Sequence, residues 1–367
     1  MAALEIITAL ATHNIALFKK IEYQKLRKML AHEGPQGEYL SKYLAVPNLH
    51  LTPNPTYKSA NGILAHNTLG YRGPAYTTVK PANVYRVICL GGSTTYGFNL
   101  EKYQDAYPYL LERELNESIK TGALKNQTVF DSAQVLNAGI EGANMFIVLA
   151  QYMYKYRLFN PNMIIVHEGI NDAYAYTGNI YNTDYAHLRT NLLQLKPLSR
   201  PLQWCMKSNF LSLVIIAFNY SDTIMINKVV DDPAYPQWCR CEKGNCDYFD
   251  KSRNAFFQNS LMLSRLTLAD SLQLVFFPMM YNRHDAEKAS NKDIKFAIDS
   301  HAGFWQQLAN SKSSTCLNID PMTIDPKYFF DACHLNPQGN ALKAAVIRPQ
   351  IENYILTNSP ANQPLVK

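Results

Sequence analysis

Short apolar runs that alternate with helical segments constrain the fold of this chain more than any other feature of its sequence. Five such runs have the length of a strand: residues 84–90, 135–137, 163–166, 272–277 and 316–319. Helical patterns lie among them and after the last: around residues 106–119, 145–158, 294–308 and 337–355. Runs that are apolar throughout are typical of strands buried on both faces. The order predicts an α/β protein, a three-layer α/β/α sandwich around a central, mostly parallel five-stranded sheet.

The part of the chain before residue 81 has a different character. Residues 1 to about 33 have a helical pattern that ends at Gly34 and Pro35. Residues 34–80 are rich in Pro, Asn, Gly and Tyr, with little periodicity. We predict an N-terminal helix and extended arm over residues 1–80, wrapped around one larger domain over residues 81–360.

The interval between the third and fourth predicted strands holds roughly a hundred residues, far more than one crossover helix needs. It contains an apolar segment from Phe210 to Phe218. We predict a cap-like insertion at about 174–265. Because ligands of parallel sheets bind beyond the carboxyl ends of the strands, we expect this insertion to lie over the functional site.

Composition and charge exclude several classes of protein. The apolar fraction of 47% is that of a globular chain. The net charge is +6, but no run of five basic residues occurs, so we expect no nucleic-acid partner. No stretch has the roughly 20 apolar residues of a spanning helix, and the first ten residues do not resemble a signal peptide. The basic stretch from Lys19 to Lys28 and the apolar insertion leave contact with a membrane surface open. The oligomeric state is not indicated.

Three of the seven cysteines cluster in the insertion: Cys239, Cys241 and Cys246. We favour a disulfide that closes a short loop, which indicates an oxidising compartment. Free thiols are the alternative, and a metal knuckle would need a fourth ligand where no His stands nearby. An extracytoplasmic location is therefore favoured over a cytoplasmic one.

A serine follows the first predicted strand, in Gly91-Gly92-Ser93-Thr94. After two glycines at a strand-to-helix turn, its hydroxyl can point out of the sheet while its N–H faces a bound oxygen. The turn alone also fits a phosphate-binding loop or a simple connection. No Lys follows at the position that a P-loop requires.

Two further segments offer hydrogen-bond donors after the second and third strands. Residues 137–144 contain Gly139 and Gly142, where a backbone N–H can approach a ligand closely. Residues 168–172 contain Asn171, whose side-chain amide can donate to an oxyanion. A plain βα turn and a helix cap are the alternatives for these segments.

Asp331 and His334 stand three positions apart, just before a helix with Pro337 near its start. In one tight turn, the carboxylate can fix the imidazole tautomer and stabilise the imidazolium. The imidazole can then take a proton from a serine and return it to a leaving group. An exposed turn with a chance spacing is the alternative.

In their order along the chain, these four segments resemble the SGNH (GDSL-like) hydrolase superfamily. The resemblance spans residues 88 to about 345. It implies the flavodoxin-like fold of that family, with Ser93 as nucleophile, His334 as general base and Asp331 as its orienting carboxylate.

The resemblance also implies an oxyanion hole made of the Ser93 N–H, the Gly142 N–H and the Asn171 side chain. Gly142 is selected because the family's glycine lies five positions after the strand-end Asn137. Gly139 is the second choice.

The chain departs from the family pattern at three positions. Gly92 stands where the family usually has Asp, Thr94 replaces Leu, and Ile170 occupies a position where Gly is frequent. The hydrogen bonding of the serine loop must therefore differ. Arg72 lies in a stretch that resembles one upstream of the Ser block in many bacterial members. It is expected in a structural arm, with a place in the cleft as the alternative.

The chemistry implied is ester cleavage through an acyl-serine, with neither cofactor nor metal. The substrate is expected to be a small molecule, a carbohydrate O-acetyl group or a lipid-like ester. One alternative is an O-acyltransferase with the same Ser, His and Asp. The other is a non-catalytic binding protein on the SGNH scaffold.

Overall fold

The structure is a computed structural model, and every structural statement below concerns its described residues. These are residues 2–14, 23–30, 41–46, 49–59, 61–176, 180–182, 200–219, 240–242, 254–288, 292–311, 314–320 and 323–358.

A five-stranded parallel sheet forms the centre of the molecule, with the order β4-β3-β5-β8-β9. Its strands are β3 (Val84–Gly91), β4 (Ser132–Gly139), β5 (Met163–His167), β8 (Gln273–Phe276) and β9 (Thr315–Cys316). The predicted α/β class is therefore confirmed. Successive connections run to opposite sides of β3, and a sheet of this kind binds ligands beyond the carboxyl ends of its strands at the switch point.

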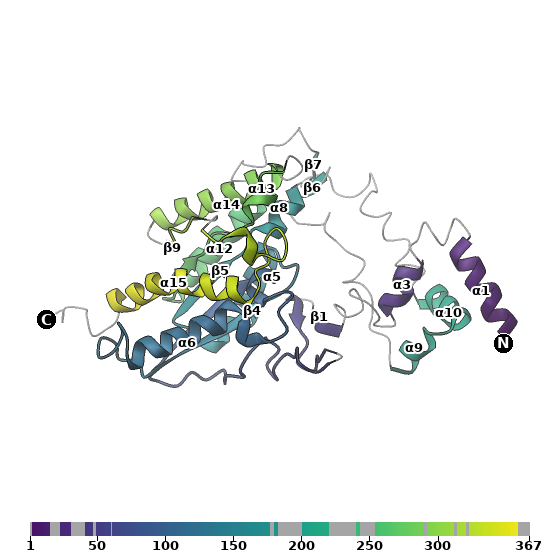
Figure 1. The fold of residues 1–367 in the computed structure, drawn as a ribbon, viewed down its shortest axis with the longest axis horizontal. Coiled ribbons are helices and arrows are strands. Elements are labelled where there is room, and N and C mark those ends of the chain that lie inside the picture. Colours follow the sequence, from purple (N-terminus) through teal and green to yellow (C-terminus); the bar gives the residue numbers. More distant parts are fainter. Residues whose placement is uncertain are drawn as a thin grey trace.

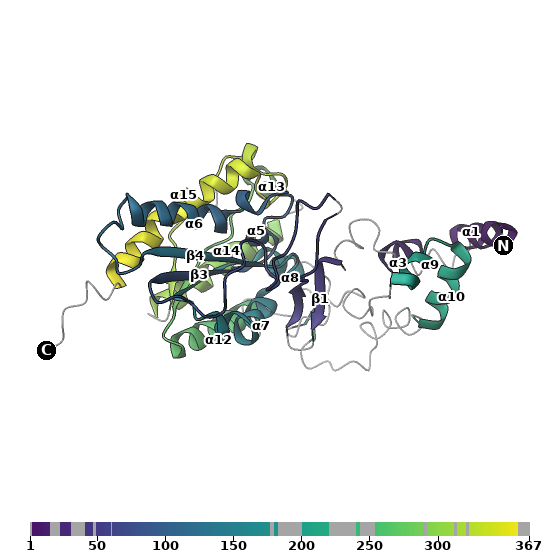
Figure 2. The ribbon, with the colours of Figure 1, turned by 90° about the horizontal axis from the view of Figure 1, so that it is seen from below.

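Helices cover both faces of the sheet because successive strand residues point to opposite sides. On one face, α6 (Tyr107–Lys120) and α15 (Pro337–Asn358) pack against a cluster that includes Val87 and Cys89. On the other, α7 (Met145–Tyr154), α12 (Ala255–Ala269) and α14 (Lys292–Asn310) pack against a cluster that includes Ile88 and Leu90. Figure 2 shows α6 and α15 on one side of the strands and α7 and α12 on the other.

The remaining elements are short or lie outside the sandwich. Two hairpins pair antiparallel: β1 (Tyr43–Val46) with β2 (His50–Pro53), and β6 (Ile180–Asn182) with β7 (Arg240–Glu242). The other helices are α1 (Ala2–Asn14), α3 (Tyr23–Leu30), α5 (Ser93–Tyr96), α8 (Ile170–Tyr176), α9 (Arg200–Cys205), α10 (Asn209–Asn219) and α13 (Arg283–Ala286). Three 3-10 turns complete them: Tyr103–Asp105, Tyr156–Phe159 and Pro326–Tyr328.

Four helices gather at one end of the molecule, beyond β1. Figures 1 and 2 both show α1, α3, α9 and α10 together there, apart from the sheet. We call them the N-terminal helix group. Within the helix predicted over residues 1–33, residues 2–14 and 23–30 are helical, and residues 15–22 and 31–33 lie outside the described residues. Helices α9 and α10, from the expected cap, lie in this group and not over the sheet.

Polar contacts explain why α9 and α10 join the N-terminal helices. Glu5 of α1 accepts hydrogen bonds at the start of α10, from the Asn209 N–H at 2.7 Å and from the Ser208 hydroxyl. A carboxylate at a helix N-terminus satisfies free N–H groups and is favoured by the helix dipole. Arg27 of α3 donates to the carbonyl oxygens of Met206 at 2.7 Å and Lys207 at 2.6 Å, beyond the end of α9.

Residues 174–265 also include part of the sandwich. Helix α12, at the end of this interval, packs on the sheet through Phe256 and Leu263. The division of the chain at residue 81 and the limits of the insertion stay predictions.

The proposed disulfide lies outside the described residues. Cys239 and Cys246 are not described, and of Cys241 only the backbone in β7 is. Four of the described cysteines are free thiols: Cys89, Cys205, Cys316 and Cys333.

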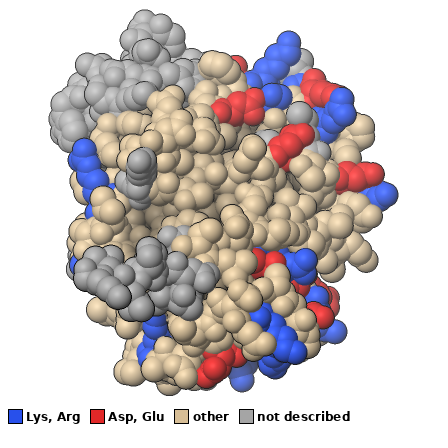
Figure 3. Space-filling view, turned by 90° about the vertical axis from the view of Figure 1, so that its left-hand side faces the viewer, with Lys and Arg blue, Asp and Glu red and all other residues tan. Residues whose placement is uncertain are grey.

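No helix in the described ranges is long and apolar enough to cross a membrane. Figure 3 shows the face on the left of Figure 1, where basic and acidic side chains are interspersed among the described residues. The described residues visible on that face form no continuous basic stripe of the kind that nucleic acids require.

Candidate active site

A sharp turn between β3 and α5 presents Ser93 at the carboxyl edge of the sheet. Gly91, the last residue of β3, has φ +156°, and a Cβ there would lie 2.1 Å from the carbonyl oxygen of His167. Only glycine fits this position without displacing the neighbouring strand. Ser93 is then the first residue of α5, and it is 8% exposed.

Ser93, His334 and Asp331 form one hydrogen-bonded chain. His334 Nε2 lies 2.7 Å from Ser93 Oγ, although the two residues are 241 positions apart. On the other side of the ring, His334 Nδ1 lies 2.8 Å from Asp331 Oδ2. This geometry allows the hydroxyl to pass its proton to the imidazole while the carboxylate stabilises the resulting positive charge.

The turn that carries Asp331 also holds its carboxylate in place. Asp331 Oδ1 accepts hydrogen bonds from the backbone N–H groups of Cys333 at 3.0 Å and His334 at 2.9 Å. Partial burial raises the pKa of Asp331, but the hydrogen bonds from the His334 side chain and from these N–H groups outweigh it and lower the pKa to about 2. The carboxylate therefore stays ionised at any pH at which the protein would work.

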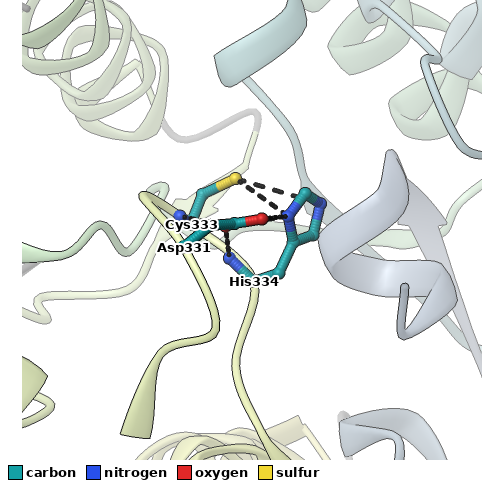
Figure 4. A group of neighbouring side chains, drawn as sticks. All are labelled: Asp331, Cys333 and His334. Carbon is teal, nitrogen blue, oxygen red and sulfur yellow. Dashed lines mark hydrogen bonds and ion pairs between the residues drawn. The ribbon is translucent and has the colours of Figure 1, made fainter. Parts of the chain in front are cut away.

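Two side chains enclose the imidazole of His334. The ring of Phe98, which follows α5, lies 4.8 Å from it between centroids. The thiol of Cys333 lies 3.7 Å from Nδ1, and Figure 4 shows it beside Asp331, directed at the ring. The sequence analysis did not select Phe98 or Cys333. Both stand next to the motif residues, but neither has a side chain with an evident catalytic role.

Asp331, Cys333 and His334 also offer three metal-ligand atoms within 4.8 Å of one another. Burial and the charge of Asp331 raise the pKa of the Cys333 thiol well above its usual range. A thiol binds metal as the thiolate, and Nδ1 is already paired with Asp331. The donor set is therefore poorly suited to a metal, and it suits a catalytic turn.

The backbone N–H groups of Ser93 and Gly142 are available at this edge. Neither donates to an acceptor among the described residues. The Gly139 N–H, in contrast, donates to Asn137 Oδ1 at 3.1 Å, and a Cβ on Gly139 would lie 2.2 Å from the Tyr96 nitrogen. The geometry thus favours Gly142 over Gly139 as an oxyanion donor.

Asn171 lies directly behind the serine turn. Its Nδ2 would be 3.0 Å from a Cβ at Gly92, and it donates to the carbonyl oxygen of Ala143 at 2.6 Å. The second N–H of this amide has only a long contact, 3.4 Å to Glu168 Oε1. It can therefore turn to a developing oxyanion.

Asp172 is hydrogen-bonded to the segment that follows β4. Its Oδ2 accepts the backbone N–H of Met145 at 3.0 Å, at the start of α7. The residue ties the segment after β5 to the segment after β4, as a loop anchor would.

Glu168 is a residue that the sequence reasoning missed. Its carboxyl is 1% exposed, accepts the Gly169 N–H at 2.9 Å through Oε1, and touches Asn171. Its Oε2 accepts no hydrogen bond within the described part of the chain and lies 2.4 Å from where a Cβ on Gly92 would be. Burial, and then the charge of Asp172, raise the pKa of Glu168 to about 8. Gly92 is the sequence feature that could have pointed to this carboxyl. The Asp that the family usually has there would need the space that Glu168 Oε2 occupies.

Arg72 does not reach the cleft, as expected for the arm. It is 1% exposed and donates to the carbonyl oxygens of Tyr96 at 2.9 Å, Gly97 at 2.6 Å and Leu100 at 2.6 Å. It therefore holds the loop that follows the nucleophile helix and carries Phe98.

Lys343 of α15 is a second buried ionisable residue near the serine turn. Its Nζ lies 3.5 Å from the Thr94 carbonyl oxygen and 4.2 Å from the centre of the Tyr107 ring. Burial lowers its pKa to about 7.

A polar cavity of about 250 Å³ opens beside the serine turn. Lys42 and Asn61 of the arm form one wall of the cavity. Phe98 and Asn99, in the loop after α5, and Glu141 form the rest. Glu141 precedes Gly142 and pairs with Lys42 at 2.8 Å. Phe98 lines this cavity, and its ring also lies 4.8 Å from that of His334 between centroids.

The fold and the site can be compared with known proteins. No curated protein matches the chain. An acetylxylan esterase from Geobacillus stearothermophilus is similar in structure, with 13% identity, a TM-score of 0.43, and coverage of 73% of this chain and 94% of that one. A GDSL-like lipase from Bacteroides thetaiotaomicron has 15% identity, a TM-score of 0.36, and coverage of 73% and 88%.

The sequence of this chain matches one protein-family model over more than half of its length. The family model described as GDSL-like Lipase/Acylhydrolase matches residues 87–347, which include every strand of the sheet except the first residues of β3, and all four site segments. The chain belongs to the GDSL-like lipase/acylhydrolase family and is a hydrolase that acts on ester bonds.

Proposed function

We propose that the protein is a serine esterase that cleaves the ester of a polar, hydroxyl-rich alcohol through an acyl-Ser93 intermediate. The observation that carries this proposal is the continuous chain of hydrogen bonds from Ser93 Oγ through His334 to Asp331.

In the first step, Ser93 Oγ attacks the ester carbonyl carbon while its proton passes to His334 Nε2. The carbonyl oxygen becomes an oxyanion and receives hydrogen bonds from the Ser93 N–H, the Gly142 N–H and Asn171 Nδ2. When the intermediate collapses, the bond to the alcohol oxygen breaks, and His334 returns the proton to that oxygen. The acyl group is left on Ser93.

In the second step, His334 removes a proton from water, and the hydroxide attacks the acyl carbon. A second oxyanion forms in the same hole. It collapses to the carboxylic acid as the bond to Ser93 Oγ breaks, and His334 returns the proton to Ser93 Oγ. Asp331, held ionised by its hydrogen bonds, stabilises the imidazolium in both steps.

Glu168 acts through Asn171 as a positioning residue. Because its pKa is raised to about 8, it is neutral at pH 7 and does not attract the second Asn171 N–H as a carboxylate would. Gly92 leaves the space that this carboxyl fills. The departure from the family's Gly-Asp-Ser pattern is thus matched by a carboxyl supplied from the end of β5.

The cavity beside Phe98 supports a polar leaving group. Asn61 and Asn99 both donate and accept hydrogen bonds, as sugar hydroxyls require, and Lys42 is already neutralised by Glu141. Phe98 is 38% exposed and offers an apolar ring surface beside the catalytic base. A carbohydrate O-acyl ester fits this combination better than a long lipid chain does.

The proposal is tested with an acetylated oligosaccharide and an aryl acetate as paired substrates. We expect Asn61→Ala and Phe98→Ala to raise KM for the sugar ester about tenfold, with a much smaller effect on the aryl ester. Product analysis with added unacylated sugar is the second arm. Equal effects on both substrates would contradict the sugar site, and acyl transfer to the added sugar in place of hydrolysis would contradict the esterase.

A further inference from the structure

Helix α1 turns its apolar side toward solvent. At about 100° per residue, Ile6, Ile7 and Leu10 fall on one side of the helix. Their exposed fractions are 61%, 63% and 59%, and Leu4 at the edge of this side is 40% exposed. We call these four residues the α1 apolar face. Exposed apolar residues scattered singly are ordinary, but a continuous helical face of aliphatic side chains marks a binding surface.

The opposite side of α1 is polar and buried. Thr8 and Thr12 are 6% and 2% exposed, and the Thr12 hydroxyl donates to the Thr8 carbonyl oxygen at 2.9 Å. Thr12 also accepts a hydrogen bond from the Gln24 amide at 3.1 Å. Together with the Glu5 contacts at the start of α10, these bonds fix which side of α1 faces its neighbours. The arrangement is the reverse of a helix on the surface of a protein surrounded by water alone.

The described side chains of the N-terminal helix group carry more positive than negative charge. Among its described side chains, Arg27 and Lys28 of α3 and Lys207, between α9 and α10, are basic, and Glu5 of α1 is acidic. The carboxylate of Glu5 is used at the start of α10. In the same group, Trp204 of α9 is 71% exposed, and Trp is common at the boundary between water and lipid.

We propose that the α1 apolar face rests in the interfacial layer of an anionic lipid bilayer. This face is aliphatic apart from Asn14 at the end of α1, whose side chain donates to the Leu10 carbonyl oxygen. Such a face suits lipid better than a specific protein partner, which would usually be met by aromatic and hydrogen-bonding groups. The surrounding positive charge matches anionic headgroups. The surface lies outside the sandwich that carries Ser93, so this proposal does not depend on the proposed catalytic function.

The test is flotation of the full chain with vesicles of phosphatidylcholine alone and of phosphatidylcholine mixed with phosphatidylglycerol. We expect wild type to float with the mixed vesicles, more weakly with the neutral ones, and less at high salt. The double variant Ile7→Glu with Leu10→Glu should lose at least about tenfold in partitioning. A charge-matched control, Leu158→Glu with Leu268→Glu, changes side chains that are 71% and 59% exposed elsewhere, and should float like wild type.

Hydrolysis of a soluble aryl ester and the circular dichroism spectrum report folding of each variant independently of lipid. Failure of wild type to float, or an equal loss in the control variant, would overturn the proposal. So would a dimer, seen by light scattering without lipid binding, that the Ile7/Leu10 variant dissociates. That result would make the α1 apolar face an interface between copies of the chain.

Discussion

Gly92 and Glu168 are complementary in a way that local sequence does not display. The carboxyl of Glu168 occupies the space that a side chain at position 92 would need, and it touches the proposed oxyanion donor Asn171. From the sequence, Gly92 was only a departure from the family pattern. The compensating residue lies 76 positions later and is brought in by the pairing of β3 with β5.

Gly92→Ala should therefore impair both folding and catalysis. The new Cβ would lie 2.4 Å from Glu168 Oε2 and 3.0 Å from Asn171 Nδ2. We expect a loss of about 1–3 kcal/mol of unfolding free energy from overpacking. We also expect kcat to fall on the order of 10²-fold if Asn171 is displaced as a donor.

A double-mutant cycle measures this contact. Combining Gly92→Ala with Glu168→Ala restores the space, so the double variant should be less impaired than the two single effects predict when summed. Strict additivity would show that the two residues do not interact.

The raised pKa of Glu168 should make stability depend on pH. Its pKa of about 8 in the folded state exceeds the ordinary value of 4.5, so the folded protein binds more protons between these values. The stabilisation is fully present below about pH 4.5 and is lost as the pH rises to about 8, with a slope of at most about 1.4 kcal/mol per pH unit. Denaturant unfolding across this range should show the decline in wild type and a flatter curve in Glu168→Gln. Parallel curves would contradict the assignment.

Strands and helices of the sandwich were predictable because each depends on local pattern. The predicted strand at residues 84–90 is β3 (Val84–Gly91), and the predicted helix at residues 337–355 is α15 (Pro337–Asn358). The apolar segment at residues 210–218 is a helix, α10, but nothing in it reveals that α1 and α3 are its partners. Those contacts join residues about 200 positions apart, through polar caps that periodicity does not encode.

The start of α15 links the catalytic turn to the fold. The side chain of Asn336 accepts the Gly339 N–H at 2.9 Å, as an N-cap does, and Pro337 follows at the first helical position. Asn336→Ala should lower the unfolding free energy by about 1 kcal/mol. Because the same residue follows the Asp331–His334 turn, we expect a moderate fall in kcat with little change in KM. An unchanged melting temperature would contradict the capping role, with Asn336→Asp as the conservative control.

The whole molecule consists of a sandwich, an arm that lies along it and a helix group at one end (Figure 1). The arm is fastened by Arg72, whose guanidinium donates to four backbone carbonyl oxygens between Tyr96 and Glu101, around Phe98. The sequence indicated an arm, but the cavity between the arm and this loop depends on how two distant segments meet. The site residues named from the family pattern, in contrast, do come together at one edge of the sheet.

Arg72→Ala should be strongly destabilising because it leaves several buried carbonyl oxygens without donors, at about 1–3 kcal/mol each. Arg72→Lys keeps the charge but not the fork of donors, so we expect partial recovery. Urea unfolding measures both. If Arg72→Ala were as stable as wild type, the arm would not be held by this residue.

The central claim is that Ser93 carries the acyl group, and covalent labelling tests it most directly. After reaction with a fluorophosphonate, intact mass and peptide mapping should show one adduct, on the peptide that contains Ser93. Ser93→Ala should form none and should lose at least about 10³-fold in ester hydrolysis while keeping its fold. An adduct on another residue, or hydrolysis retained by Ser93→Ala, would contradict the account.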